Sequence, residues 1–147
     1  MRRAPPPGSM LLLTRLSKAV YRHATEQVLG MNLKEYAALA TLRDHDQVTQ
    51  QVLCETIHLD PNNCVLLLNA LEGGGLAERR RDPADRRRHY VEITPAGRQA
   101  LARAERALES VEEQVLGALT ADERATLHDL LLRAAEAAEV RSTGAIA

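Results

Sequence analysis

Apolar residues along this chain recur mostly at intervals of three and four, the spacing that places them on one face of an α-helix. The pattern predicts a first helix that Ser9 caps and that extends to about Val28. Asn32 and Glu35 have the spacing of a capping box, which opens a second helix to about Arg43. The first third of the chain is therefore predicted to be helical.

Two shorter helices are predicted in the middle of the chain. Thr49 caps the first of them, which extends from Gln50 to about His58. Asp60 as N-cap and Pro61 as the first helical residue then form a strong start signal for the second. Three consecutive glycines end this helix. Its apolar residues, at intervals of three and four, are Cys64, Leu67, Leu68 and Leu71.

The spacing of buried positions in these two helices is typical of a helix-turn-helix. Leu53 and Ile57 are predicted to form the core of the first helix, with the small residue Cys54 between the two helices. His58 occupies the turn, where glycine is commonest, and must adopt a left-handed conformation there. The other core positions are Leu59 beneath the turn and, on the second helix, Cys64 and Leu67.

A β-hairpin is predicted after the glycines. Two extended segments, 76–80 and 89–93, flank a polar loop at 81–88 that contains Pro83. Residues 79–88 include six Arg and two Asp, whereas residues 95–140 contain nine acidic and five basic residues. The chain as a whole has a formal net charge of −1, so its positive charge is concentrated on this hairpin. A local basic patch on a nearly neutral protein is typical of a DNA-binding surface.

The helix-turn-helix and the hairpin together predict a surface that could bind both grooves of DNA. The outer face of the second short helix presents Asn62, Asn63, Val65, Leu66 and Asn69. Asn can bind adenine through two hydrogen bonds in the major groove, and Val can contact a thymine methyl group. Leu66 is expected either to pack against the hairpin or to contact bases. The hairpin arginines suit a narrow, A·T-rich minor groove.

Two longer helices are predicted at the C-terminal end. Thr94 and Pro95 start the first, which extends to about Leu116 or Leu119. Its apolar residues repeat every seven positions, and this seam favours packing against a partner helix. Thr120 and Glu123 form a further capping box that opens a last helix to about Val140. The apolar seam of the long helix contains Leu101, Ala104, Leu108, Val111 and Val115.

Composition excludes several other classes of protein. Three Tyr and no Phe or Trp exclude an aromatic stacking platform for single-stranded nucleic acid. No apolar run is long enough for a transmembrane helix, and the N-terminal prolines break any signal peptide, so we expect a cytoplasmic protein without a membrane partner. The chain contains no nucleophile elbow, phosphate loop, dinucleotide fingerprint or metalloprotease helix. We therefore expect neither an enzyme nor a cofactor.

Residues 60–101 resemble the core signature of the MarR-type (multiple antibiotic resistance) regulators. The specific parts are the wing Asp82–Arg87, with its D-P-x-D-R-R pattern, and the I-T-P-A-G-R turn Ile93–Arg98. The flanking helices occur in the order of that family, so the resemblance covers about residues 11–140. One departure lies in the second short helix, which corresponds to the family's DNA-recognition helix: the family usually has Ser, Thr or Arg there, and this chain has Val65, Leu66 and Ala70.

The resemblance implies a mainly α fold: a winged helix-turn-helix with a two-stranded β-hairpin wing and a helical dimerisation region. It implies a homodimer, held together by the first and the last two helices, that binds a pseudo-palindromic site on double-stranded DNA. The family's Asp-x-Arg wing motif falls on Asp85 and Arg87. Arg87 is thus the expected minor-groove residue and Asp85 its brace, and Arg86 and Arg88 are assigned to phosphates.

The predicted domain organisation follows. Residues 1–8 form a disordered arm, 9–31 and 95–140 a helical dimerisation region, 32–94 the DNA-binding domain, and 141–147 a flexible tail. Asp82 and Asp85 are expected to hold neighbouring guanidinium groups. The full set of predicted DNA-binding residues is Thr49, Gln50, Asn62, Asn63, Val65, Leu66, Asn69, Arg81, Asp85, Arg86, Arg87 and Arg88.

The family commonly represses a promoter and is released by a small molecule, so the resemblance also implies an aromatic or phenolic effector. Tyr21, Arg22 and His23 on the first helix are the candidate effector residues. Two alternatives stay open: a helical dimeric adaptor for another protein, and a redox sensor that uses Cys54 and Cys64.

The alternative roles of the cysteines differ in their chemistry. As free thiols, Cys54 and Cys64 are small apolar core residues that react slowly because they are buried. The two positions are expected to face each other across the helix pair, and their oxidation would strain the helix-turn-helix. A structural zinc site is not expected, because Cys54, His58 and Cys64 lack both the paired spacing and the fourth ligand that such a site needs.

Overall fold

The computed structural model describes residues 3–144, and their side chains as far as residue 139. It divides into two compact units, one that ends at Val111 and one that begins at Glu112. The elements of the first unit are, in order, α1 (Ser9–His23), α2 (Glu26–Leu29), α3 (Leu33–Asp44), β1 (Val48–Thr49), α4 (Gln50–Thr56), α5 (Pro61–Gly73), β2 (Ala77–Arg81), β3 (His89–Ile93) and most of α6 (Pro95–Leu116). The second contains the end of α6 and α7 (Ala121–Gly144).

The predicted first helix is two helices. Gly8, not Ser9, is the N-cap of α1, and α1 ends at His23. Thr25 then adopts an extended backbone and caps α2, where its hydroxyl accepts a hydrogen bond from the N–H of Val28. The prediction of one continuous helix to Val28 is wrong because a threonine competes well as an N-cap, and because the break lets Leu29 turn into the core.

A small antiparallel sheet supports the middle of the chain. The predicted hairpin is confirmed: β2 pairs with β3 from Ala77 opposite Ile93 to Arg81 opposite His89. β1 pairs with the other edge of β3 and gives the strand order β1-β3-β2. The third strand was not predicted, because two residues are too few to show an alternating pattern.

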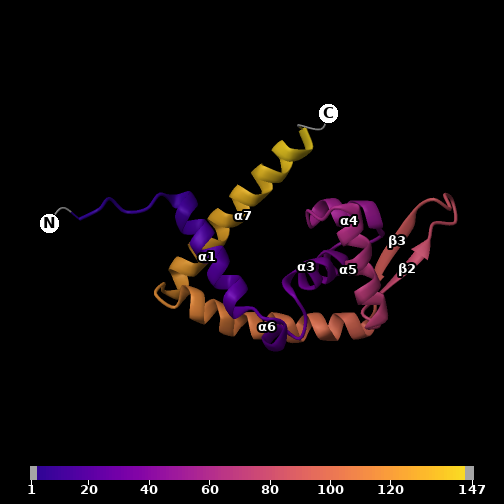
Figure 1. Cartoon of the computed structure of the whole chain (residues 1–147), viewed down its shortest axis with the longest axis horizontal. Helices are drawn as coiled ribbons and strands as arrows, with labels where there is room; N and C mark the ends of the chain where they lie inside the picture. The colour runs from indigo at the N-terminus through magenta and orange to yellow at the C-terminus, as the bar shows by residue number, and fades with distance from the viewer. Residues whose placement is uncertain (1–2, 145–147) are drawn as a thin grey trace. The chain divides into compact units, whose positions relative to one another are not determined.

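The core of the first unit lies where α3, α4 and α5 meet the sheet. Figure 1 shows these three helices gathered beside β2 and β3. Leucines dominate this core, which explains how a chain with no Phe or Trp forms one. The most deeply buried side chains are Leu39, Leu53, Cys64, Leu68, Leu71 and Leu101.

The start of α6 is tied to the end of α5. The Thr94 hydroxyl donates to the carbonyl of Gly75 at 2.6 Å and accepts from the N–H of Gly97 at 3.0 Å. A Cβ atom at Gly97 would lie 2.1 Å from the carbonyl oxygen of Leu76, inside contact distance. The glycine of the P-A-G turn is therefore required by this close approach between α6 and the chain before β2.

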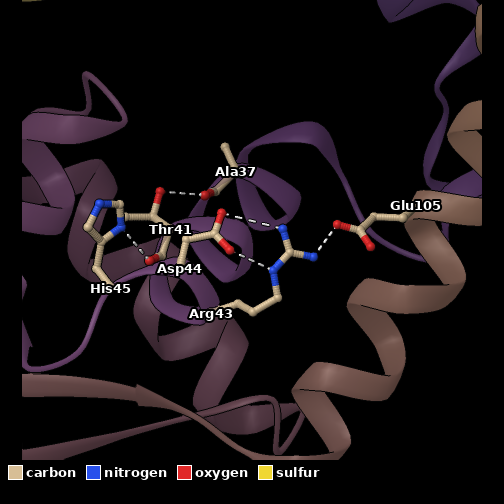
Figure 2. Close-up of polar contacts among 6 residues, drawn as sticks. All are labelled: Ala37, Thr41, Arg43, Asp44, His45 and Glu105. Carbon is tan, nitrogen blue, oxygen red and sulfur yellow. Dashed lines mark hydrogen bonds and ion pairs between the residues drawn. The ribbon is translucent and has the colours of Figure 1, made fainter.

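An ion pair joins α3 to α6, as Figure 2 shows. The Arg43 guanidinium contacts the carboxylate of Glu105 and also donates to Asp44, with 2.9 Å between Nε and Oδ1. These two hydrogen bonds raise the pKa of Arg43 further above its ordinary value. Burial raises the pKa of the nearby Tyr36 hydroxyl, and the negative charge of Glu105 adds to that effect. The cluster links α3, in the core of the first unit, to the long helix α6.

In the second unit, the capping box predicted at the start of the last helix is confirmed. The N–H of Thr120 donates to the Glu123 carboxylate at 2.9 Å, and the N–H of Glu123 donates to the Thr120 hydroxyl at 3.2 Å. The helix continues to Gly144, so the predicted end at Val140 and the predicted tail at 141–144 are wrong, because no proline or glycine interrupts the helix before that residue. Residues 145–147 of that tail, and residues 1–2 of the predicted arm, lie outside the described residues.

Candidate nucleic-acid interface

The two helices of the predicted helix-turn-helix, α4 and α5, are joined by a tight turn. The Thr49 hydroxyl caps α4 by accepting from the N–H of Val52 at 3.2 Å. α4 ends at Thr56, two residues earlier than predicted, and Leu59 N–H donates back to the carbonyl of Cys54 at 3.0 Å. His58 has a φ of 55°, so the prediction of a left-handed residue in this turn is confirmed.

The start signal of α5 works as the sequence predicts. The Asp60 carboxylate accepts from the N–H of Asn63 at 2.9 Å and from its side-chain amide at 2.6 Å. These hydrogen bonds, the backbone one first, lower the pKa of Asp60, so the carboxylate is ionised at neutral pH. Cys64, Leu67, Leu68 and Leu71 are buried, and this fixes which face of α5 points outward.

The outer face of α5 is exposed at every predicted position. Asn62, Asn63 and Asn69 are exposed, and Leu66 is 65% exposed. Leu66 lines a groove of about 230 Å³ together with the first turn of α3, so it does not pack against the wing. Val65 lies on the other flank of α5, towards the wing.

A larger groove of about 520 Å³ lies between helices α4 and α5 and the loop end of the wing. The predicted residues Thr49 and Gln50 line it on one side, and Arg87 and Arg88 line it on the other. Six residues of this groove were absent from the predicted DNA-binding set, and among them only the position of Gln51 in the first turn of α4 gave a signal. These six residues are Gln51, Cys54, Glu55, Leu59, Pro61 and His89.

The two aspartates of the wing bind backbone rather than side chains. Asp82 accepts from the N–H of Ala84 at 2.9 Å, and Asp85 accepts from the N–H of Arg87 at 3.0 Å. The prediction that they hold guanidinium groups is therefore wrong, because each carboxylate closes a tight local turn instead. Asp85 still braces Arg87, but through its main chain.

The six arginines of the wing fall into two groups. Arg79 binds Glu72 and Asn69 of α5, and Arg80 pairs with Glu92 at 3.4 Å. The remaining four, Arg81, Arg86, Arg87 and Arg88, are exposed, and no ion pair involves them within the described residues. The basic surface is therefore the loop, not the whole hairpin.

The two cysteines face each other across α4 and α5, as predicted, but they are not free thiols. Cys54 and Cys64 form a disulfide bond with a Cα–Cα distance of 5.7 Å. The expectation of two inert core thiols is wrong, because the turn at His58 brings the two helices close enough for a bond. Cys54 also lines the larger groove, whereas Cys64 is fully buried.

The three candidate effector residues lie at the end of α1. Tyr21 is 62% exposed, Arg22 is exposed, and His23 is half-buried. They do not line either of the two grooves beside α5. Within the part of the chain that the structure describes, no cluster of three or more His, Cys, Asp or Glu is arranged to hold a metal ion. The same residues include no helix with the length and apolar character needed to cross a membrane.

Comparison with known sequences gives a consistent result. The MarR family model matches residues 29–88, which contain the helix-turn-helix and the wing. A regulatory protein assigned to the hcr operon of Thauera aromatica is 36% identical over 98 residues, which are 67% of this chain and 59% of that protein. The chain thus spans about three fifths of this relative's length. The transcriptional regulator HosA of Escherichia coli O111:H- is 33% identical over 90 residues, or 61% of this chain and 67% of HosA.

Two solved structures resemble the whole fold. The transcriptional repressor CouR, bound to a 23-mer DNA duplex, is 27% identical with a TM-score of 0.75, over 90% of this chain and 99% of that one. The PcaV regulator of Streptomyces coelicolor, in complex with its natural ligand, is 27% identical with a TM-score of 0.72, over 93% and 99% of the two chains. Both similarities extend well beyond the helix-turn-helix.

Proposed function

This chain belongs to the MarR family of DNA-binding transcriptional regulators, which are not enzymes, and from this premise we propose that it acts in the cytoplasm as a homodimeric repressor. Each protomer inserts α5 into the major groove of one half of a pseudo-palindromic operator. The exposed loop of the wing lies in the adjacent minor groove, with Arg87 as its probe, while Arg86 and Arg88 bind phosphates.

One observation carries this proposal: the arginines of the loop are exposed and form no ion pair among the described residues, and they lie beside a helix whose outer face presents three asparagines. Arg87 and Arg88 share a groove with Thr49 and Gln50, the residues that start α4. A helix N-terminus and free guanidinium groups both favour phosphate. The DNA-bound structure of the similar repressor CouR supports this use of the fold.

The dimer is supported by apolar side chains that the chain leaves uncovered. On α1, Leu12, Leu13 and Leu16 are exposed, and on α7 three consecutive leucines are exposed. Contiguous exposed apolar residues mark interaction surfaces. We therefore assign residues 9–31 and 95–140 to dimerisation and residues 32–94 to DNA binding.

Release from DNA is proposed to follow the binding of a small aromatic or phenolic molecule. The similar PcaV regulator has been crystallised with a natural ligand. A ligand releases the operator only if it binds the two states of the dimer with different affinity. Tyr21, Arg22 and His23 at the end of α1 offer an aromatic ring, a guanidinium group and an imidazole for such a molecule, next to the connection that leads into the DNA-binding domain.

The salt dependence of DNA binding tests the proposal. Arg86 and Arg88 from each protomer neutralise four phosphates, so the affinity for a palindromic duplex is expected to fall by about 100-fold between about 50 and 200 mM salt. Titration of a labelled duplex by fluorescence anisotropy measures this slope. Affinity that does not change with salt contradicts the proposal and favours a dimeric adaptor for another protein.

The disulfide favours a second candidate function, a redox-controlled regulator. Disulfides of cytosolic proteins are usually transient and often act as sensors. In the proposed step a dithiol reductant attacks Sγ of Cys54 from the groove, the Cys54–Cys64 bond breaks, and Cys64 leaves as a thiolate that takes up a proton. The second thiol of the reductant then releases Cys54 and closes the reductant's own disulfide, which completes a two-electron transfer.

Comparing oxidised and reduced protein tests this second candidate. Because the bond holds α4 against α5, reduction is expected to weaken operator binding. The double variant Cys54→Ser, Cys64→Ser serves as the control and is expected to bind equally in both conditions. Equal binding by oxidised and reduced wild type contradicts redox control and leaves the repressor proposal intact.

A further inference from the structure

Asn69, on the exposed face of α5, is hydrogen-bonded by a residue that lies outside this helix. It lies seven residues after Asn62, so the two side chains share the outer face of α5, about 10 Å apart along its axis. The Oδ1 atom of Asn69 accepts a hydrogen bond from Nη2 of Arg79 at 2.7 Å. Arg79 belongs to β2, outside the reading helix.

Arg79 is itself fixed in place. Its Nε donates to one carboxylate oxygen of Glu72, and its Nη2 lies 3.4 Å from the other oxygen. Arg79 and Glu72 are both partly buried, with side chains 25% and 34% exposed. A two-point contact between a planar guanidinium and a carboxylate restricts the orientation of both groups. Arg79 therefore directs Nη2 towards Asn69 from a defined direction.

The chemistry of Arg79 determines which end of the Asn69 amide faces outward. A guanidinium group has only donors, so the amide oxygen must point towards it and the NH₂ group must point away. Asn63 has the opposite arrangement, because its NH₂ group donates to the ionised Asp60 carboxylate at 2.6 Å. Two asparagines of one helix thus differ in the group that each leaves free.

We propose that Arg79 is a positioning residue that makes Asn69 select a keto base, guanine foremost or thymine, at its place in the operator. Guanine and thymine present acceptors in the major groove, and guanine presents two side by side. The usual contact of Asn with adenine needs the amide oxygen as an acceptor, and here that oxygen is bound to a cation. The amino groups of adenine and cytosine would also meet the positive charge of Arg79. This inference rests on the proposed operator binding and names part of the operator's sequence.

The test is selection of bound duplexes from a library with a randomised half-site, using the full chain. Asn69→Ala identifies the position whose preference depends on Asn69. At that position the wild type is expected to enrich keto over amino bases by about fivefold or more, the lower end of the discrimination typical of a base contact. Arg79→Met, which keeps the length of the side chain and removes its donors, is expected to lose the preference and to gain adenine.

Arg80→Met is the matched control. Arg80 is the next residue on the same strand, but it pairs with Glu78 and Glu92 and contacts no residue of the reading face in the pairs described. It is expected to leave the base preference unchanged. Glu72→Gln retains Arg79 and weakens its anchor, so an intermediate preference is expected, and this variant carries the test if Arg79→Met does not fold.

Three results would overturn the inference. They are enrichment of adenine or cytosine by the wild type at the Asn69 position, the absence of any position that depends on Asn69, and an unchanged preference in folded Arg79→Met. Each is compatible with salt-dependent binding to DNA and so leaves the proposed function standing. Failure to bind any duplex at low salt overturns the proposed function itself.

Discussion

Three consecutive leucines occur in α5, at positions 66–68, and again in α7, at positions 130–132. In α5 the rest of the core covers two of the three leucines: Leu67 and Leu68 are buried, and only Leu66 is exposed. In α7 all three are about half exposed, at 52%, 45% and 49%. The same local sequence is a core element where the chain supplies a partner and an open surface where it does not.

The arginines of the wing repeat this contrast. Arg79 and Arg80 pair with carboxylates of the chain, whereas no carboxylate in the described part of the chain pairs with Arg86, Arg87 or Arg88. We propose that the exposed leucines of α7 and the exposed arginines of the wing loop each contact another molecule. For α7 that molecule is proposed to be a second copy of the chain, and for the wing loop it is proposed to be DNA.

Placing a charge on the open leucine surface is expected to have the largest effect. Leu131→Glu should shift the dimer towards monomer, because a carboxylate is costly in an apolar interface. Operator affinity should then fall by about 10²–10⁴-fold, since the two half-sites no longer bind as one unit. Sedimentation velocity and anisotropy measure the two effects, and Leu131→Met is the control. A dimeric Leu131→Glu variant with full affinity would place the interface elsewhere.

Removing a covered leucine tests the other side of the comparison. Leu68→Ala should lower the free energy of unfolding by about 2–5 kcal/mol, because it leaves a cavity in the core between α5 and the sheet. Leu66→Ala, two residues away and exposed, should change it by less than about 0.5 kcal/mol. Denaturant unfolding of both variants gives the difference. Equal losses of unfolding free energy in the two variants would mean that the difference in burial does not determine their contributions to stability.

Arg87→Ala is expected to weaken operator binding by about 1–3 kcal/mol and to relax the preference for A·T pairs beside the half-sites. Arg80→Ala removes the same charge from the same hairpin, but from an arginine that already has partners. It should therefore cost much less affinity. Competition binding with flanks rich in A·T or G·C measures both quantities. Similar losses in the two variants would assign the effect to net charge rather than to a minor-groove contact.

The smallest expected effect concerns the cap of α5, which the chain satisfies by itself. Hydrogen bonds from Asn63 lower the pKa of Asp60 in the folded state, so its contribution to stability is present above the unfolded pKa and is lost as pH falls through the lower folded pKa. In Asp60→Asn the cap remains but does not titrate. The difference in unfolding free energy between wild type and variant should change only below about pH 4, and a change near neutral pH would assign it to another group.

Much of the candidate site was predictable because it depends on local geometry. The exposed face of α5 follows from the intervals between its buried residues, and the left-handed His58 follows from its place in the turn. The roles of Asp82 and Asp85 were predicted wrongly, because a carboxylate next to arginines and free N–H groups has two possible partners. Only the folded loop decides between them.

The sequence by itself determined where most helices begin. Asp60 with Pro61, Asn32 with Glu35, and Thr120 with Glu123 act over three residues or fewer, so their hydrogen bonds are present in the fold as predicted. Such signals need no distant partner, because a cap and the N–H that it binds lie in one turn.

Only the tertiary structure decided which distant groups meet. Arg43 and Glu105 are 62 residues apart. Strand β1 precedes the helix-turn-helix in the sequence, but it pairs with β3, which follows it. The contact of Arg79 with Asn69 depends on how the hairpin returns along α5, although only ten residues separate them. The sequence contains no pattern that predicts these pairs, because each depends on how whole helices and strands pack together. The orientation of the Asn69 amide, and with it the proposed preference for a keto base, likewise depends on the tertiary structure.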